Sequence, residues 1–329
     1  MRAIILAAGY STRLWPLTID RAKPAVPFMN RPLVGYVAEY LARYNYREVL
    51  INLHHQPDSV REALGDGSRF GVKLYYIEEP EILGTSGAWD NARDLLAEET
   101  FLAINGKIIT DIDLDAALRT HREANAIATL VLRPNRRREK FSIVEVRDGL
   151  IDKFGGMPVV ASDKADDDFD HPLMFTGIQI LDPRIFSYVP RNRFSHSTVD
   201  VYPAAMAAGE RVVAHVAEGE WAELSTIPRY LDIHLQMLAR EGRKTISGKN
   251  VEIHSSASVT DAVMWDDVVI EKGVFVRRAV LGDGVIVPPG RRIENAAVVR
   301  ADLVRGSEAP PKALAGEFDG DNFIVPFSQ

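Results

Sequence analysis

The stretch that decides the fold is residues 1–28, "MRAIILAAGYSTRLWPLTIDRAKPAVPF". Its apolar run from Ala3 to Ala8 is typical of a strand that is buried on both faces of a sheet. The run ends at Gly9, and polar side chains follow at Ser11, Thr12, Arg13 and Lys23. A glycine-containing turn after a strand gathers backbone N–H groups in one concavity, which suits an anion, and an arginine fork matches phosphate oxygens. The stretch therefore predicts a cradle for a triphosphate, although such a turn alone also suits an ordinary strand-to-helix connection.

Strands and helices alternate through the first two-thirds of the chain. Short apolar runs predict strands, and apolar residues at helical spacing predict the helices between them. The expected strands are 48–52, 72–77, 100–105 and 126–132, and the expected helices are 31–45, 56–67, 85–99 and 113–125, the last with Asp113 as its N-cap. This order predicts a mostly parallel sheet with helices on both faces, whose ligands bind at the carboxyl ends of the strands. The first glycine turn is such an end.

The bulk composition narrows the function classes. A chain of 329 residues is long enough for two domains with a large core. Its net charge of −7 argues against nucleic acid or an acidic membrane as the main partner. The absence of cysteine excludes disulfides, thiolate metal sites and a cysteine nucleophile. No apolar run approaches the roughly 20 residues that span a bilayer, so we expect a cytoplasmic protein.

The last third of the chain changes its period after Gly248. Apolar residues recur every six positions at Ile253, Val259 and Trp265, at Ile270 and Val276, and at Val287, Ile293 and Val299. A six-residue repeat fits a parallel β-helix with three flat faces per coil, and an ordinary antiparallel tail is the alternative. We therefore expect three parts: residues 1–245, a short β-helix over 246–305, and a tail over 306–329 that ends in a strand.

Several motifs, in a matching order, resemble the sugar-1-phosphate nucleotidyltransferase family, also called nucleotide-sugar pyrophosphorylases. "LAAGYSTRLWPLT" at 6–18 resembles the family's opening L-A-A-G-x-G-T-R-L-x-P-L-T, with Ser11 at the second glycine. Later motifs of the family are matched by "LGTSGA" (83–88), "NGKIITDIDL" (105–114), "MFTGIQIL" (174–181) and "WAELSTIPRYL" (221–231). In look, the chain is most similar to mannose-1-phosphate guanylyltransferase-like proteins. The resemblance implies an α/β fold with a Rossmann-like, mostly parallel sheet and a short C-terminal left-handed parallel β-helix of hexapeptide repeats.

The resemblance also implies a reaction and the residues that carry it. An oxygen of a hexose-1-phosphate would attack the α-phosphorus of an NTP and release pyrophosphate, with Mg²⁺ assisting. Arg13 and Lys23 would be catalytic, because charge grows on the α-phosphate in the transition state. The implied nucleotide contacts are Leu6, Ala7, Ala8, Gly9, Ser11, Thr12, Arg13, Lys23, Glu79, Gly84 and Thr85, and the implied sugar contacts are Asn105, Gly106, Thr176 and Gly177.

Two further expectations concern the base. Gly84 and Gly87 would lie close to the base and ribose. A carboxylate at Glu79 or Glu81 would accept from N1–H and N2–H of guanine, which favours GTP, with mannose-1-phosphate as the preferred sugar. Either glutamate would otherwise simply face water.

The metal positions depart from the family's pattern. The aspartate of N-G-D, a magnesium ligand in the family, is Lys107 here, and the second metal aspartate is Glu223. Lysine offers no lone pair to a metal at neutral pH, whereas glutamate is a hard oxygen ligand. Asp111 is a further candidate ligand, with a turn residue as its alternative role. Met157 stands where many relatives bind the sugar phosphate with a lysine.

Two hypotheses therefore stay open. The first is an active sugar-1-phosphate nucleotidyltransferase. The second is a catalytically impaired protein of the same fold that binds a nucleotide or nucleotide-sugar as a sensor, scaffold or regulator. The motif set favours the first and Lys107 favours the second. In both cases we expect small-molecule partners, no nucleic acid and no membrane, and a possible homo-oligomer formed through the β-helix.

Overall fold

The computed structural model describes residues 1–136, 139–155 and 171–327, so Met157 lies outside the described residues. The chain forms two compact units, which are treated separately below. The first unit comprises Met1–Ala8, Val37–His54 and Asp66–Trp221, and the second comprises Gly9–Tyr36, His55–Gly65 and Ala222–Gln329. The sequence-based division at 245 and 305 stays a prediction. Within the described residues, no helix is long and apolar enough to cross a membrane.

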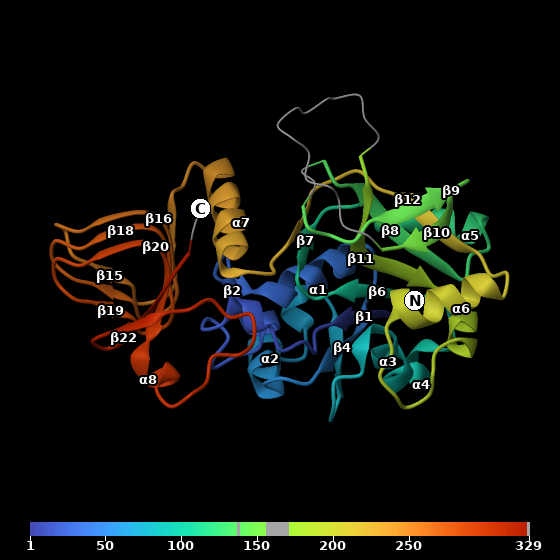
Figure 1. Ribbon diagram of the computed structural model, residues 1–329, viewed down its shortest axis with the longest axis horizontal. Coiled ribbons are helices and arrows are strands. Elements are labelled where there is room, and N and C mark those ends of the chain that lie inside the picture. Colours follow the sequence, from blue (N-terminus) through green and yellow to red (C-terminus); the bar gives the residue numbers. More distant parts are fainter. Residues whose placement is uncertain (137–138, 156–170, 328–329) are drawn as a thin grey trace. The chain divides into compact units, whose positions relative to one another are not determined.

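The first unit is built on a sheet that, in the described part of the chain, has nine strands in the order β5-β4-β1-β6-β11-β8-β12-β10-β9 (Figure 1). The strands are β1 (Ala3–Leu6), β4 (Glu48–Leu53), β5 (Lys73–Glu78), β6 (Phe101–Asn105), β8 (Ala128–Pro134), β9 (Val144–Arg147), β10 (Leu150–Phe154), β11 (Leu173–Leu181) and β12 (Val212–Val216). β1 pairs in parallel with β4 and β6, and β5 continues the parallel set beside β4, as predicted. β11 is antiparallel to both of its neighbours, β6 and β8, so the sheet is parallel-rich rather than wholly parallel.

The helices of the first unit follow the predicted order with one break. They are α3 (Gly84–Asn91), α4 (Arg93–Leu96), α5 (Leu114–Glu123) and α6 (Tyr202–Ala207), with the short turns η3 (Ser68–Phe70), η4 (Pro183–Ser187) and η5 (Ser197–Val201). The helix expected over 85–99 is two pieces, α3 and α4. At the break, Arg93 donates to the carbonyl oxygens of Phe186 and Val189, which ties this segment to η4 and its neighbour. Asp113 caps α5 as predicted, because its Oδ1 accepts from Asp115 N at 2.9 Å.

The second unit contains the β-helix. Its strands are β14 (Thr245–Ser247), β15 (Glu252–Ile253), β16 (Ser258–Met264), β17 (Val269–Ile270), β18 (Phe275–Leu281), β19 (Ile286–Val287) and β20 (Arg292–Arg300). Figure 1 shows β16, β18 and β20 stacked side by side. Each residue pairs in parallel with one 17 positions further along the chain, as Ala262 does with Ala279. The predicted hexad residues Ile253, Ile270 and Val287 therefore stack in one column. Ile270, Val276 and Val287 lie in the coil interior as predicted, whereas Ile253, in the first coil, is exposed.

The tail closes the β-helix with a strand, as predicted. β22 (Asn322–Pro326) pairs antiparallel with β20 and with β21 (Glu317–Asp319). The other elements of this unit are η1 (Thr12–Leu14), η2 (Lys23–Ala25), β2 (Pro27–Phe28), β3 (Arg31–Pro32), α2 (Pro57–Leu64), α7 (Ile227–Arg240) and α8 (Ala301–Val304). The helix α1 (Leu33–Arg43) and the strand β13 (Trp221–Glu223) have residues in both units, and β7 (Ile108–Thr110) belongs to the first.

The segment after the first strand is joined to the β-helix within the second unit. Arg21 pairs with Asp283 at 2.5 Å, and its guanidinium lies over the Trp265 ring, 5.0 Å from the centroid. Trp265 also donates from Nε1 to the hydroxyl of Tyr230 on α7, at 3.1 Å. Arg21 also makes a bidentate pair with its neighbour Asp20, and an arginine held by two carboxylates and stacked on an aromatic face forms a stiff connection. The loop between η1 and η2 is therefore fixed to the β-helix through Arg21.

Candidate active site

Three parallel strands of the first unit end at the same level. In the pairing register, Leu6 of β1 lies opposite Asn52 of β4 on one side and Asn105 of β6 on the other. Asn52 in turn lies opposite Ile77 of β5. In α/β sheets, ligands bind at the carboxyl ends of such strands. Polar side chains at these positions therefore face the edge where a substrate is expected.

The turn after β1 is open at one glycine and strained at one serine. Among the residues that the structure describes, and apart from its chain neighbours, nothing lies within 4 Å of a Cβ built on Gly9. Ser11 has φ 58° and ψ 27°, the left-handed conformation that favours glycine. This explains why the family pattern has glycine at that position. Arg13, in η1, is exposed.

Lys23 begins the short turn η2. Its neighbours Pro24 and Ala25 are buried, and the turn is anchored where Ala22 N donates to Ser59 Oγ at 3.0 Å. The lysine itself is half-buried. The structure thus places Lys23 on an anchored turn of the second unit, and its catalytic role stays a prediction.

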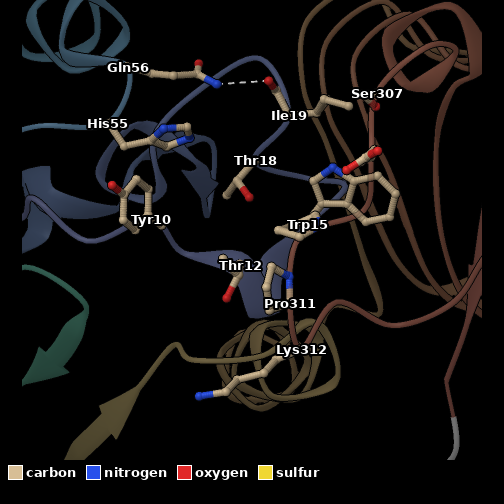
Figure 2. A pocket seen from close by; sticks show the side chains of 12 residues that line it. Tyr10, Thr12, Trp15, Thr18, Ile19, His55, Gln56, Ser307, Pro311 and Lys312 are labelled. Atoms are coloured by element: carbon tan, nitrogen blue, oxygen red, sulfur yellow. Dashed lines mark hydrogen bonds between the residues drawn. The ribbon is translucent and has the colours of Figure 1, made fainter.

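A cavity of about 600 Å³ lies within the second unit, beside the turn after β1, which we call the signature turn (Figure 2). Its lining residues are Tyr10, Thr12, Trp15, Thr18, Ile19, His55, Gln56, Ser307, Glu308, Pro310, Pro311 and Lys312. The rings of Tyr10 and His55 are 5.9 Å apart, and Gln56 is fixed by donating to the carbonyl oxygen of Ile19. The wall is mostly apolar, and one side of it comes from the tail. The contribution of residues 307–312 was not expected from the sequence, because the tail carries no recognisable motif.

The segment that begins α3 uses its glycines for packing. A Cβ on Gly84, where φ is +76°, would overlap the carbonyl oxygen of Ser195, and one on Gly87 would lie 2.9 Å from the carbonyl oxygen of Arg193. Thr85 Oγ1 accepts from Ser197 N at 2.8 Å. The structure therefore accounts for these small residues by close approach of the 193–197 segment. The expected proximity of Gly84, Thr85 and Gly87 to base and ribose stays a prediction.

Glu79 is buried and already bonded to the protein. Asn52 Nδ2 donates to its Oε1 at 2.6 Å, and Leu83 N donates to its Oε2 at 3.0 Å. Burial raises the pKa of the Glu79 carboxyl, while the two donors oppose that change. A direct contact with guanine, as the sequence suggested, would need a second donor to reach a carboxylate that is buried and already accepts a hydrogen bond on each oxygen. Glu81, the other candidate, is exposed.

The expected sugar-side residues gather at the junction of β6 and β11. Gly177 lies in a register irregularity of β11 with φ +82°, and a Cβ there would overlap the Asn105 side chain. The bulge thus makes room for Asn105, as bulges next to active sites commonly do. Gly106 lies against Ile5 and the Leu6 carbonyl oxygen. Thr176 is different: it is buried and its hydroxyl donates to the Val131 carbonyl oxygen at 2.7 Å, so this hydroxyl is turned into the sheet.

The side chains at the family's metal positions do not fit a magnesium site. Among the residues that the structure describes, no three His, Cys, Asp or Glu side chains gather as a metal site would require. The Asp111 side chain has a structural partner, because its Oδ1 accepts a hydrogen bond from Glu220 N at 2.6 Å. The donor set at these positions is an ammonium and a single carboxylate, where Mg²⁺ prefers several oxygens.

Asn52 is the site residue that the sequence analysis missed. It is buried, and its Oδ1 accepts from Ala7 N at 2.7 Å, so it links the end of β4 to the turn after β1. The signal that would have found it is a single amide within the apolar run "EVLINL". His54, also missed, contacts the Glu79 carbonyl oxygen through Nδ1 at 2.8 Å.

The parallel-rich sheet and the β-helix define an α/β protein with a C-terminal repeat domain. Comparison of the sequence with family models agrees: residues 2–240 match the nucleotidyl transferase model, and residues 239–302 match the GlmU-like C-terminal hexapeptide model. The chain belongs to the nucleotidyl transferase family.

Two named relatives are identical to this chain at about a quarter of the aligned residues. A UTP–glucose-1-phosphate uridylyltransferase of Synechocystis is 28% identical over 84% of this chain and 74% of its own length. A mannose-1-phosphate guanylyltransferase of Mycobacterium tuberculosis is 25% identical over 90% of this chain and 82% of its own. A crystal structure of a putative glucose-1-phosphate thymidylyltransferase from Bacillus anthracis shares the fold, with a TM-score of 0.60, 20% identity, and coverage of 74% of this chain and 95% of that one.

Proposed function

We propose that the protein is a sugar-1-phosphate nucleotidyltransferase. A phosphate oxygen of the sugar-1-phosphate forms a bond to the α-phosphorus of an NTP, the bond from that phosphorus to the bridging oxygen breaks, and pyrophosphate leaves with the electron pair. The observation that carries the proposal is the common edge formed by Leu6, Asn52 and Asn105, from which the glycine turn continues. Family membership and the names of the relatives support the same reaction.

The signature turn and Lys23 are proposed to supply the electrostatics. The space beside Gly9 leaves room for a phosphate group to approach the backbone. Arg13 offers a planar fork to phosphate oxygens, and Lys23 offers a compact charge for the α-phosphate. Preorganised cations of this kind stabilise charge that grows on the phosphoryl group in the transition state. The cavity beside Tyr10 and Thr12 is the proposed entry for the nucleotide.

GTP with mannose-1-phosphate is the proposed substrate pair. The support is the guanylyltransferases among the relatives, since Glu79 is engaged within the protein. The uridylyltransferase relative makes UTP with glucose-1-phosphate the first competing pair to test. We also propose the cytoplasm as the location, and assembly through the β-helix.

The second candidate is a nucleotide-binding protein with little turnover, and Lys107 is the observation that favours it. Magnesium, where a family site holds it, neutralises phosphate charge and orients oxygens. An ammonium at position 107 supplies one positive charge and no ligand. If the lost interaction stabilised the transition state by about 4 kcal/mol, the rate would fall roughly a thousandfold.

A pyrophosphate-release assay across NTP and sugar-1-phosphate pairs separates the two candidates. We expect slow release by the natural protein that depends little on Mg²⁺, and faster, Mg²⁺-dependent release by Lys107→Asp, by tenfold to a thousandfold. Lys107→Ala is the matched control, because it removes the ammonium without adding a ligand. Fast, Mg²⁺-dependent pyrophosphate release by the natural protein would show that Lys107 does not impair catalysis. Calorimetry with no binding of any NTP or nucleotide-sugar would remove both candidates.

A further inference from the structure

We propose that Asn52 and Glu79 are positioning residues: they form a directional hydrogen-bond relay that sets the turn after β1 and the start of the "LGTSGA" segment against each other. The relay runs from Ala7 N to Asn52 Oδ1, from Asn52 Nδ2 to Glu79 Oε1, and from Leu83 N to Glu79 Oε2. All four residues belong to the first unit. The inference rests on the proposed function, because it assigns these two segments to the nucleotide.

The direction of each bond follows from the chemistry of its ends. The two terminal groups are backbone N–H donors, at Ala7 and Leu83. The Asn52 amide carries one acceptor and one donor group. Its oxygen accepts from the Ala7 N–H, and its nitrogen therefore presents a donor to Glu79. The last member must then accept twice, and an ionised carboxylate is the side chain that only accepts. Glutamine at position 79 would present one amide nitrogen to a donor.

The surroundings make the relay costly to break. The side chains of Asn52 and Glu79 each expose only 3% of their surface. The Glu79 backbone is held as well, since its N–H donates to the Leu53 carbonyl oxygen at 2.8 Å and its carbonyl oxygen contacts His54 Nδ1 at 2.8 Å. A buried polar network that loses one partner leaves another group without a hydrogen bond. A change at either position should therefore displace both segments that the relay connects.

The relay also revises the picture of the phosphate cradle. The N–H of Ala7 points to Asn52, so it is used within the protein and is no free donor for an anion. Fixing the Ala7 peptide sets the direction in which the chain enters Ala8 and Gly9. The cradle's donors then lie further along the turn, and Asn52 and Glu79 act on the nucleotide through the backbone rather than by touching it.

A polarity swap tests this relay. Glu79→Gln and Asn52→Asp should each weaken nucleotide binding tenfold or more, the first by setting an amide nitrogen against a donor and the second by setting two carboxylates together. The double variant Asn52→Asp/Glu79→Gln restores every bond: the new carboxylate accepts from Ala7 N, the new amide donates to it, and the amide oxygen accepts from Leu83 N. We expect its affinity within about threefold of the natural protein. Glu78→Gln is the matched control, at an exposed neighbouring carboxylate.

The readouts are the Kd for GTP by calorimetry and, where turnover is measurable, the KM for NTP against the KM for sugar-1-phosphate. If the relay positions the nucleotide, breaking it raises the KM for NTP and leaves the KM for sugar-1-phosphate within about twofold. General loss of structure would change both KM values. Single variants with natural affinity, or a double variant no tighter than the singles, would overturn the inference. Should the singles not fold, slow amide exchange at Ala7 and Leu83 in the natural protein supports the relay, and fast exchange overturns it. If the natural protein binds no nucleotide, it is the proposed function that fails.

Discussion

The turn after β1 and the start of α3 both contain small residues, yet the structure uses them in opposite ways. Beside Gly9 in the turn there is open space, and the nearby Ser11 accepts a strained backbone. Beside Gly84 and Gly87 there is backbone of the 193–197 segment, closer than any Cβ would allow. A glycine in a binding motif therefore has two possible meanings, room for a ligand or room for the protein itself. The two predict different consequences of substitution.

The largest expected effect is at Gly84. Gly84→Ala combines overlap with the Ser195 carbonyl oxygen and a left-handed φ of +76°, and neither can be relieved by rotating a side chain. We expect a loss of roughly 3 kcal/mol in the free energy of unfolding. Urea denaturation of both proteins measures it. A loss under about 1 kcal/mol would mean that the 193–197 segment moves aside easily, and that packing is not the reason for the glycine.

The intermediate effect is at Gly9, and it should appear in binding rather than in stability. Gly9→Ala places a methyl group where, apart from the chain neighbours, no atom of the described part of the chain lies within 4 Å, so the free energy of unfolding should stay within about 0.5 kcal/mol. If the open space receives a phosphate group, affinity for GTP should fall about tenfold, which is about 1.4 kcal/mol. Calorimetry and denaturation on the same samples separate the two quantities. Unchanged affinity would show that the space is merely unused surface.

The same contrast explains which parts of the molecule could be predicted from the sequence. The parallel strands and the β-helix depend on apolar spacing, and spacing is visible in the letters: the hexad residues Ile270 and Val276 lie in the coil interior as predicted. The 17-residue register was not predicted, although it is present in the sequence, because the predicted residues Ile253 and Ile270 are themselves 17 positions apart. The direction of β11 was not predicted, since an apolar run does not reveal it, and the structure makes this strand antiparallel to both neighbours.

The family was predictable from the motifs, and the family model confirmed it. The position of the site at the carboxyl ends of the strands stays a prediction, and the structure changes the interpretation of two of the predicted side chains. Thr176 and Glu79 were assigned to ligands, yet both have bonds within the protein, to the Val131 carbonyl oxygen and to Asn52 and Leu83. A carboxylate in a motif is equally suited to a base edge and to backbone N–H groups, and only the fold shows which of them it meets. Asn52 was missed for the same reason.

The smallest expected effect is at Ser11, and it has the opposite sign. A non-glycine residue in the left-handed region costs roughly 1 kcal/mol, and glycine removes that cost while adding some freedom to the unfolded chain. Ser11→Gly should therefore stabilise the protein by about 0.5 kcal/mol, although it loses the bond from Ser11 Oγ to the Gly9 carbonyl oxygen at 3.2 Å. Ser11→Ala is the control, because it loses the same bond and keeps the strained backbone, so it should be less stable than the natural protein. If Ser11→Gly is destabilising by as much as Ser11→Ala, the hydroxyl holds the turn together and the positive φ costs little. Thermal denaturation of the three proteins side by side, with and without GTP, shows whether the turn is set by its backbone conformation or by its serine.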